Sequence, residues 1–114
     1  MALNYSKLFE PNLVDNAAAE TLYTVPATPS TTLLRNARVR FSNVTAGAVT
    51  IKAWSVPLAG SASDTNVCLP TLSVGANAYV DLDIPLMKAG DFIQAQAGAA
   101  SSITSAIIDG FLQS

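Results

Sequence analysis

The sequence predicts an all-β protein: an antiparallel β-sandwich of about seven or eight strands, in a jelly-roll or immunoglobulin-like arrangement. Apolar and polar residues alternate with period two in several segments, and no segment has a convincing long helical pattern. Gly, Pro, Asn and Asp punctuate the strand-like runs at intervals of roughly ten residues. Several runs end at proline, which favours an open sandwich over a closed barrel. A chain of 114 residues has room for one such domain.

The first part of the chain lacks this alternation. We expect residues 1–19 to form an extended N-terminal arm and residues 20–114 to form the sandwich. The arm is too apolar for a freely solvated tail, so it should lie on its own sandwich or on a neighbouring subunit. A short helix over residues 13–20 is the alternative. We expect contact with a neighbouring subunit, anchored by Leu8, Phe9 and Leu13.

Seven runs have strand character, each bounded by turn-forming residues. They cover residues 21–25, 31–43, 48–56, 66–74, 78–84, 92–97 and 103–112. Residues 43–47 read as a hairpin loop in which Gly47 can supply a positive φ. Residues 58–65 are small and polar, and they predict a long exposed loop.

Two predicted strands carry charge on their outer faces. Alternation within residues 31–43 places Arg38 and Arg40 on the wet face, and alternation within residues 78–84 does the same for Asp81 and Asp83. The two arginines and two acids therefore fit a cross-strand pairing between neighbouring strands. Arg38 and Arg40 are also candidates for contact with another subunit.

The outward face of the strand at residues 48–56 is half apolar, because Trp54 and Val56 share it with Thr50 and Lys52. Such a face should be covered by the arm, by the next loop or by a partner. Trp54 suits a packed sandwich position, an interface anchor or a sugar-stacking platform. We take Trp54 and Val56 as interface candidates and expect a dimer or trimer.

The composition argues against an enzymatic function. The chain has no histidine, which removes the common nucleophilic systems, and its one cysteine, Cys68, is expected to be an inert core thiol. We predict no catalytic residue, cofactor or metal, and Asp81 with Asp83 is better explained by structure than by glycoside hydrolysis or calcium binding. A net charge of −2 argues against nucleic acid as a partner. The short apolar runs argue against a membrane, and the N-terminus lacks a signal-peptide pattern.

The order of the strands resembles small virion structural proteins of tailed bacteriophages. The segments that carry the resemblance are residues 20–26, 38–43, 49–57, 81–86 and 90–93. It implies a capsid decoration or cement protein that forms homo-oligomers, contacts the major capsid protein or other virion proteins, and resides in the virion after assembly in the host cytoplasm. A tail or baseplate component is the first alternative, and a carbohydrate-binding module using Trp54, Tyr23 or Tyr79 is the second.

Overall fold

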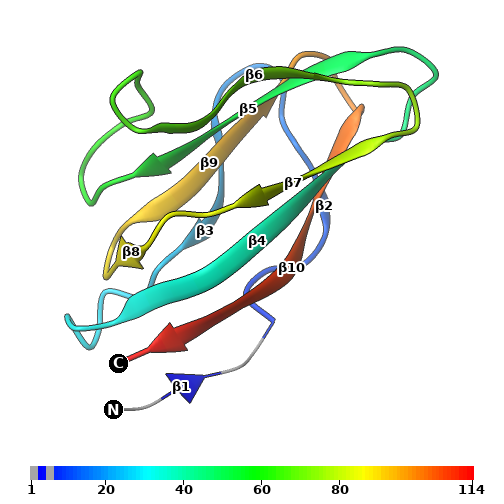
Figure 1. Cartoon of the computed structure of the whole chain (residues 1–114). Helices are drawn as coiled ribbons and strands as arrows, with labels where there is room; N and C mark the ends of the chain where they lie inside the picture. Colours follow the sequence, from blue (N-terminus) through cyan, green and yellow to red (C-terminus); the bar gives the residue numbers. More distant parts are fainter. Residues whose placement is uncertain (1–2, 5–6) are drawn as a thin grey trace.

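The alternating segments form β-strands, and the strands stack in two layers. The computed structural model describes residues 3–4 and 7–114, which contain no helix and therefore none that could span a bilayer. Figure 1 shows the two layers, with the strands of each running along the long axis of the molecule. The strands are β1 (Leu3–Asn4), β2 (Asn12–Leu13), β3 (Glu20–Thr24), β4 (Leu33–Asn43), β5 (Val49–Val56), β6 (Val67–Val74), β7 (Tyr79–Asp83), β8 (Met87–Lys88), β9 (Phe92–Ala97) and β10 (Ile103–Gln113).

All strand pairs are antiparallel. Sheet A has the order β1-β10-β4-β7, with β2 also on β10 and β8 also on β4. Sheet B has the order β3-β9-β5-β6. β1 and β2 together occupy one edge of sheet A, and β7 and β8 together occupy the other edge. Counted in this way, the chain moves to the other sheet at every connection except the one from β5 to β6. This is the jelly-roll arrangement, so the predicted two-sheet sandwich is confirmed in its jelly-roll form.

One local prediction is wrong. Residues 43–47 do not close a hairpin, because β4 pairs with β10 and β7 in sheet A while β5 pairs with β6 and β9 in sheet B. The connection instead crosses from one layer to the other. Gly47 also does not adopt the positive φ expected of it. The segment does turn the chain, because turn residues serve a crossing between packed sheets as well as they serve a hairpin.

The inward faces of the two sheets form one apolar core. In β4 the inward residues Ala37, Val39 and Phe41 are buried, as the alternation predicted, and Leu82 and Ile84 are buried on the β7 side. The largest fully buried apolar side chains are Phe41, Leu34, Ile51, Met87, Ile93 and Ile103. They come from β4, β5, β8, β9 and β10, so the core joins both layers.

The described part of the arm runs along the β10 edge of sheet A. β1 pairs with the end of β10 and β2 pairs with its beginning. Val14 is buried in the core, and its amide donates to the Ile103 carbonyl at 2.8 Å. Residues 13–20 contain no helix. In this chain, therefore, the arm lies against its own sandwich along much of its described length.

Candidate assembly surfaces

The predicted pairing of arginines and acids is present on the outer face of sheet A. The β4–β7 register sets Arg38 opposite Asp83 and Arg40 opposite Asp81. Each pair forms an ion pair, with Nε to Oδ1 distances of 2.8 and 2.7 Å. The prediction is confirmed, and the pairs hold the register of two neighbouring strands.

The Arg40 pair makes more contacts than the Arg38 pair. Arg40 binds Asp81 with two hydrogen bonds, from Nε at 2.7 Å and from Nη2 at 3.0 Å, and its guanidinium lies 4.1 Å from the centre of the Tyr79 ring. The hydrogen bonds from Arg40 lower the pKa of Asp81, and the bond to Asp81 raises the pKa of Arg40. A carboxyl group held ionised in this way is poorly suited to act as a general acid.

The described residues hold no group of three or more metal-ligating side chains that could bind a metal ion. Cys68 is half-buried against the core, and burial raises the pKa of its thiol. A thiol in these surroundings carries little thiolate near neutral pH. In this structure Cys68 therefore packs against the core, and Asp81 forms an ion pair.

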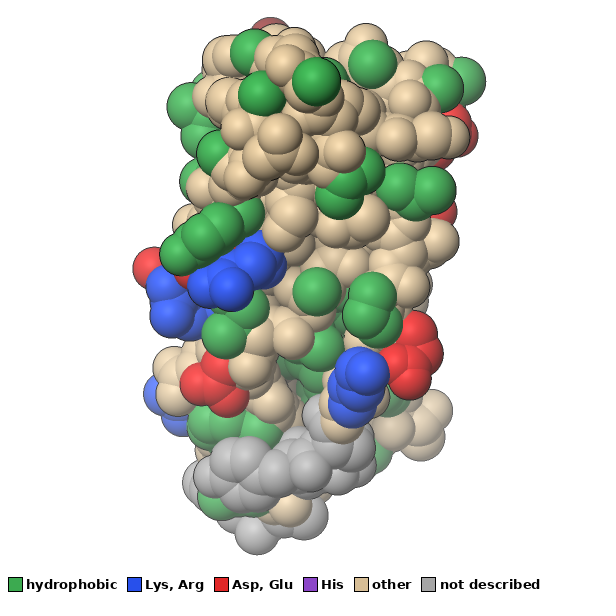
Figure 2. Space-filling view, turned by 90° about the vertical axis from the view of Figure 1, so that its right-hand side faces the viewer, with side chains coloured by type: hydrophobic (Ala, Val, Ile, Leu, Met, Phe, Trp, Pro, Cys, Tyr) green, Lys and Arg blue, Asp and Glu red, His purple; other side chains and the backbone are tan. Residues whose placement is uncertain are grey.

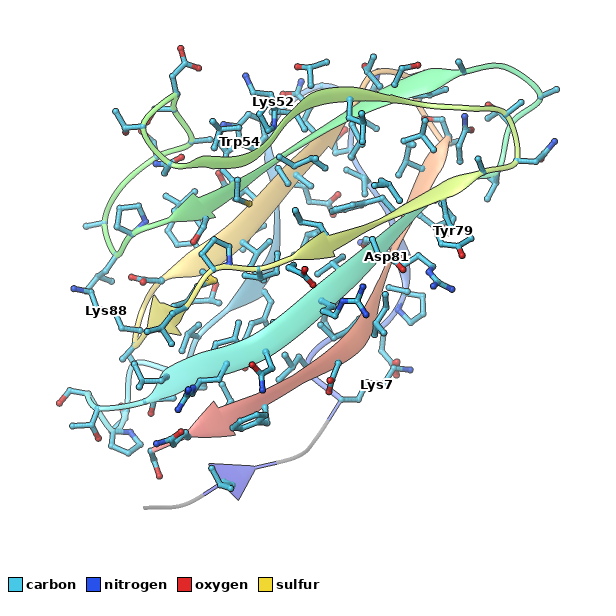
Figure 3. All side chains as sticks on the ribbon, in the orientation of Figure 1. Lys7, Lys52, Trp54, Tyr79, Asp81 and Lys88 are labelled. Carbon is cyan, nitrogen blue, oxygen red and sulfur yellow. The ribbon has the colours of Figure 1, made fainter. Side chains whose placement is uncertain are left out.

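The half-apolar face of β5 is covered by the chain itself. Trp54 is 6% exposed and Val56 is 0% exposed, yet neither belongs to the main core cluster. Lys52 lies over the Trp54 ring at 5.4 Å and reaches Asp64 in the following loop at 3.9 Å. Figure 3 shows Lys52 beside Trp54 on this side, with Tyr79 and Asp81 on β7 in the other sheet. Cover within the chain was among the alternatives expected for this face, and it leaves Trp54 and Val56 little surface to offer to a partner.

The arm candidates divide into two kinds. Leu8 and Phe9 are partly buried and pack on the core, and the Phe9 ring lies 6.4 Å from that of Tyr23. Leu13 is 46% exposed. Of the three, Leu13 offers the most surface to another molecule.

Two exposed apolar residues, Leu3 and Ile108, were not among the interface candidates chosen from the sequence. Leu3 in β1 is 49% exposed and Ile108 in β10 is 41% exposed. Together with Leu13 they form what we call the arm edge. It consists of three exposed side chains, one on β10 and one on each of the two arm strands that pair with β10. The available signal for Ile108 was its neighbour Ile107, since two adjacent isoleucines in a strand cannot both point into the core.

The loops at one end of the sandwich are small and nearly uncharged. They cover residues 15–18, 44–48, 75–78 and 98–102, and their one charged residue is Asp15. Figure 2 shows this end uppermost, with the Lys and Arg side chains gathered lower down. The buried Asn43 ties two of these loops, because its amide donates to the carbonyls of Gly47 and Val74, at 2.8 and 3.0 Å.

Comparison with known proteins identifies the fold. No family model matches the sequence, and neither does any curated protein. A chain of the Bacillus endospore appendages, a family of disulfide-linked pili, aligns with 99% of this chain and 88% of its own length, at 18% identity and a TM-score of 0.54.

Two chains of infectious bursal disease virus also align. The chain from the Gx strain matches 97% of this chain at 10% identity and a TM-score of 0.53, and the chain from the T13 particle matches 97% at 7% identity and 0.51. This chain spans 32% and 29% of those two viral chains. At such identities the likeness establishes a shared jelly-roll sandwich and leaves function to be argued separately.

Proposed function

We propose that this chain is a non-enzymatic structural subunit that assembles with copies of itself. In its specific form, the proposal is a decoration or cement protein of a tailed-bacteriophage capsid, which contacts the major capsid protein and resides in the virion. A tail or baseplate component remains the alternative. The jelly-roll fold supports the general proposal, because the three solved structures compared above come from pili and from virus particles.

The observation that carries the proposal is the arm edge. Leu3, Leu13 and Ile108 expose 49%, 46% and 41% of their surfaces on β1, on β2 and on β10, the strand with which both arm strands pair. The three lie along the length of β10, opposite Gln113, at Ile108 itself and opposite Thr104, so a partner that lay along this edge would cover all three. Leu8 and Phe9 lie on the same arm and pack against the core, so they would hold the arm in place for this contact.

The arm edge contributes to association without accounting for all of it. Each of these side chains is already about half-buried, so covering the remainder is worth about 1 kcal/mol per residue. Three of them give about 3 kcal/mol, which is less than the cost of about 4–15 kcal/mol for bringing two molecules together. A stable assembly therefore needs more of sheet A than this edge.

A sugar-binding function has less support. Trp54 is buried, and the Tyr79 ring, although exposed, has the Arg40 guanidinium on one of its faces. A stacking platform needs an aromatic face that is open to the ring of a sugar.

The test is the self-association of a variant that combines Leu13→Ser and Ile108→Ser. We expect the wild-type protein to form a dimer or trimer in light scattering, and we expect the double variant to need roughly 30-fold more protein to associate, from about 2 kcal/mol of lost burial. Leu58→Ser is the matched control, since Leu58 is 65% exposed but lies in the β5–β6 connection.

All three proteins should unfold cooperatively, and the double variant should melt several degrees below the wild type, because each replaced side chain is about half-buried within the single chain. A wild-type protein that remains monomeric at high concentration would refute self-assembly. Association that is unchanged in the double variant would remove the arm edge from the contact.

A further inference from the structure

The outer face of sheet A contains a shallow depression of about 490 Å³. It forms where β4 loses its regular pairing on both sides. Asn36 has a φ of 55°, and the β10 register shifts twice between Ile107 and Phe111. On the other side, the chain leaves β4 between Ile84 and Met87. The lining includes Arg35, Arg38, Asp83, Leu86 and Asp109.

Two charged residues of this lining, Arg35 and Asp109, form no ion pair within the described part of the chain, although Asp109 stands opposite Arg38 in the β4–β10 register. Arg38 is paired with Asp83, but Arg35 donates to the neutral Gln113 side chain at 3.1 Å. The Asp109 carboxylate accepts from the Gly110 amide at 2.8 Å. Among the ion pairs of residues 3–4 and 7–114, none includes Arg35 or Asp109. The depression therefore presents one positive and one negative group to whatever covers it.

We propose that a second copy of this chain covers the depression, and that the two copies meet around a twofold axis. Arg35 of each copy then lies against the partner's Asp109, and Leu86 of each copy, 66% exposed, enters the other's depression. The proposal rests on the self-assembly proposed above and specifies its geometry. Opposite charges within one patch are self-complementary under a twofold rotation, because each finds its counterpart on the other copy.

The dimensions of the molecule favour this face. The Cα positions extend over 46 × 26 × 17 Å, so a broad face covers about 1,200 Å² (46 × 26) and an end covers about 440 Å² (26 × 17). A stable interface buries about 800 Å² on each partner, which an end of the sandwich cannot supply. On the opposite broad face, the chain already covers Trp54 and Val56. Sheet A also continues into the arm edge, since Ile108 directly precedes Asp109.

Charge reversal tests the twofold geometry. We would prepare Arg35→Asp and Asp109→Arg separately and measure their self-association by sedimentation equilibrium, at low salt. Each variant alone places like charges at both reciprocal contacts, so its dissociation constant should rise at least about tenfold. An equimolar mixture should recover association close to that of the wild type, because a mixed pair has opposite charges at both contacts.

Lys52→Asp is the control, because it makes the same charge change on β5 of sheet B, on the opposite broad face of the molecule. It should associate like the wild type, and circular dichroism melts should show all variants folded. Recovery in the mixture supports the contact between Arg35 and Asp109, since a merely destabilised variant would not be rescued by another. A dimer as the end point of association supports the twofold axis, because a head-to-tail contact would continue into longer assemblies.

Three results would overturn the proposal. If both single variants associate like the wild type, this face is not the contact, while loss of association in the Leu13→Ser and Ile108→Ser variant would still support self-assembly. If the mixture fails to recover, the contacts are not reciprocal and the twofold axis is wrong. If the wild-type protein is monomeric at all concentrations, both this inference and the proposed self-assembly fail.

Discussion

Replacement of Asn43 by alanine should lower the free energy of unfolding. We expect a larger loss than from replacing any polar side chain within the end loops themselves. Asn43 is 2% exposed at the end of β4. Its amide nitrogen donates to the carbonyls of Gly47, Val74 and Gly75, and its Oδ1 accepts from the amide and hydroxyl of Thr45. One side chain thus ties the β4–β5 connection to the β6–β7 connection.

The magnitude follows from these contacts. Each buried hydrogen bond contributes about 1 kcal/mol, and leaving a buried carbonyl such as that of Val74 without a partner adds to the loss. We expect Asn43→Ala to lower the free energy of unfolding by about 3 kcal/mol. At about 4 °C per kcal/mol for a domain of this size, the melting temperature should fall by about 12 °C.

Asn66→Ala provides the matched control. Asn66 also ties a loop, because it accepts from the Ser63 amide at 3.0 Å and donates to the Ser61 carbonyl at 2.8 Å, but both bonds are exposed to water. Water can replace them, so the loss should stay below about 1 kcal/mol. Urea denaturation of both variants measures the difference. Equal losses would show that Asn43 does not hold the end loops together, and the reasoning would be refuted.

Two further predictions concern β7 and β10. Because Arg40 lowers the pKa of Asp81, the ionised carboxylate stabilises the folded state above the ordinary value of about 3.9, and this contribution is lost as the pH falls through the lowered pKa. Asp81→Asn should therefore be less stable than the wild type near pH 7, with a difference in urea midpoint that shrinks as the pH falls below the ordinary pKa of an aspartate. A difference that stays constant with pH would contradict this assignment. Gly110 has a φ of 143°, and a Cβ there would lie 3.1 Å from the Ala37 Cα, so Gly110→Ala should cost about 1–3 kcal/mol in a thermal melt. Gly47→Ala should cost far less, because nothing lies within 4 Å of its added Cβ, and equal costs would exclude backbone strain at Gly110.

Much of the fold could be read from local alternation. The buried run Ala37, Val39 and Phe41 and the paired charges of β4 and β7 were predicted from the period of two alone. This works because neighbouring side chains on a strand point to opposite faces, and a sandwich buries one face of each sheet.

The candidate site was less accessible to sequence reasoning. Trp54 and Val56 have the spacing of an outward face, yet the chain covers both, and that depends on where a loop folds. Arg35 and Asp109 line one depression because the register between β4 and β10 shifts on either side of Asp109. Bulges are set by packing across strands and have no fixed sequence signature.

The sequence by itself determined the class of fold, the approximate positions of the seven longer strands and the absence of histidine, because these depend on residue type and on near neighbours along the chain. The three two-residue strands, β1, β2 and β8, were not predicted. Only the tertiary structure decided which strands share a sheet. The connection after Asn43 has the composition of a hairpin loop, but it crosses between layers because β4 finds its partners in β7 and β10, which lie far away in sequence. Pairing over such distances is chosen by the packing of the whole core, and local preference cannot encode it.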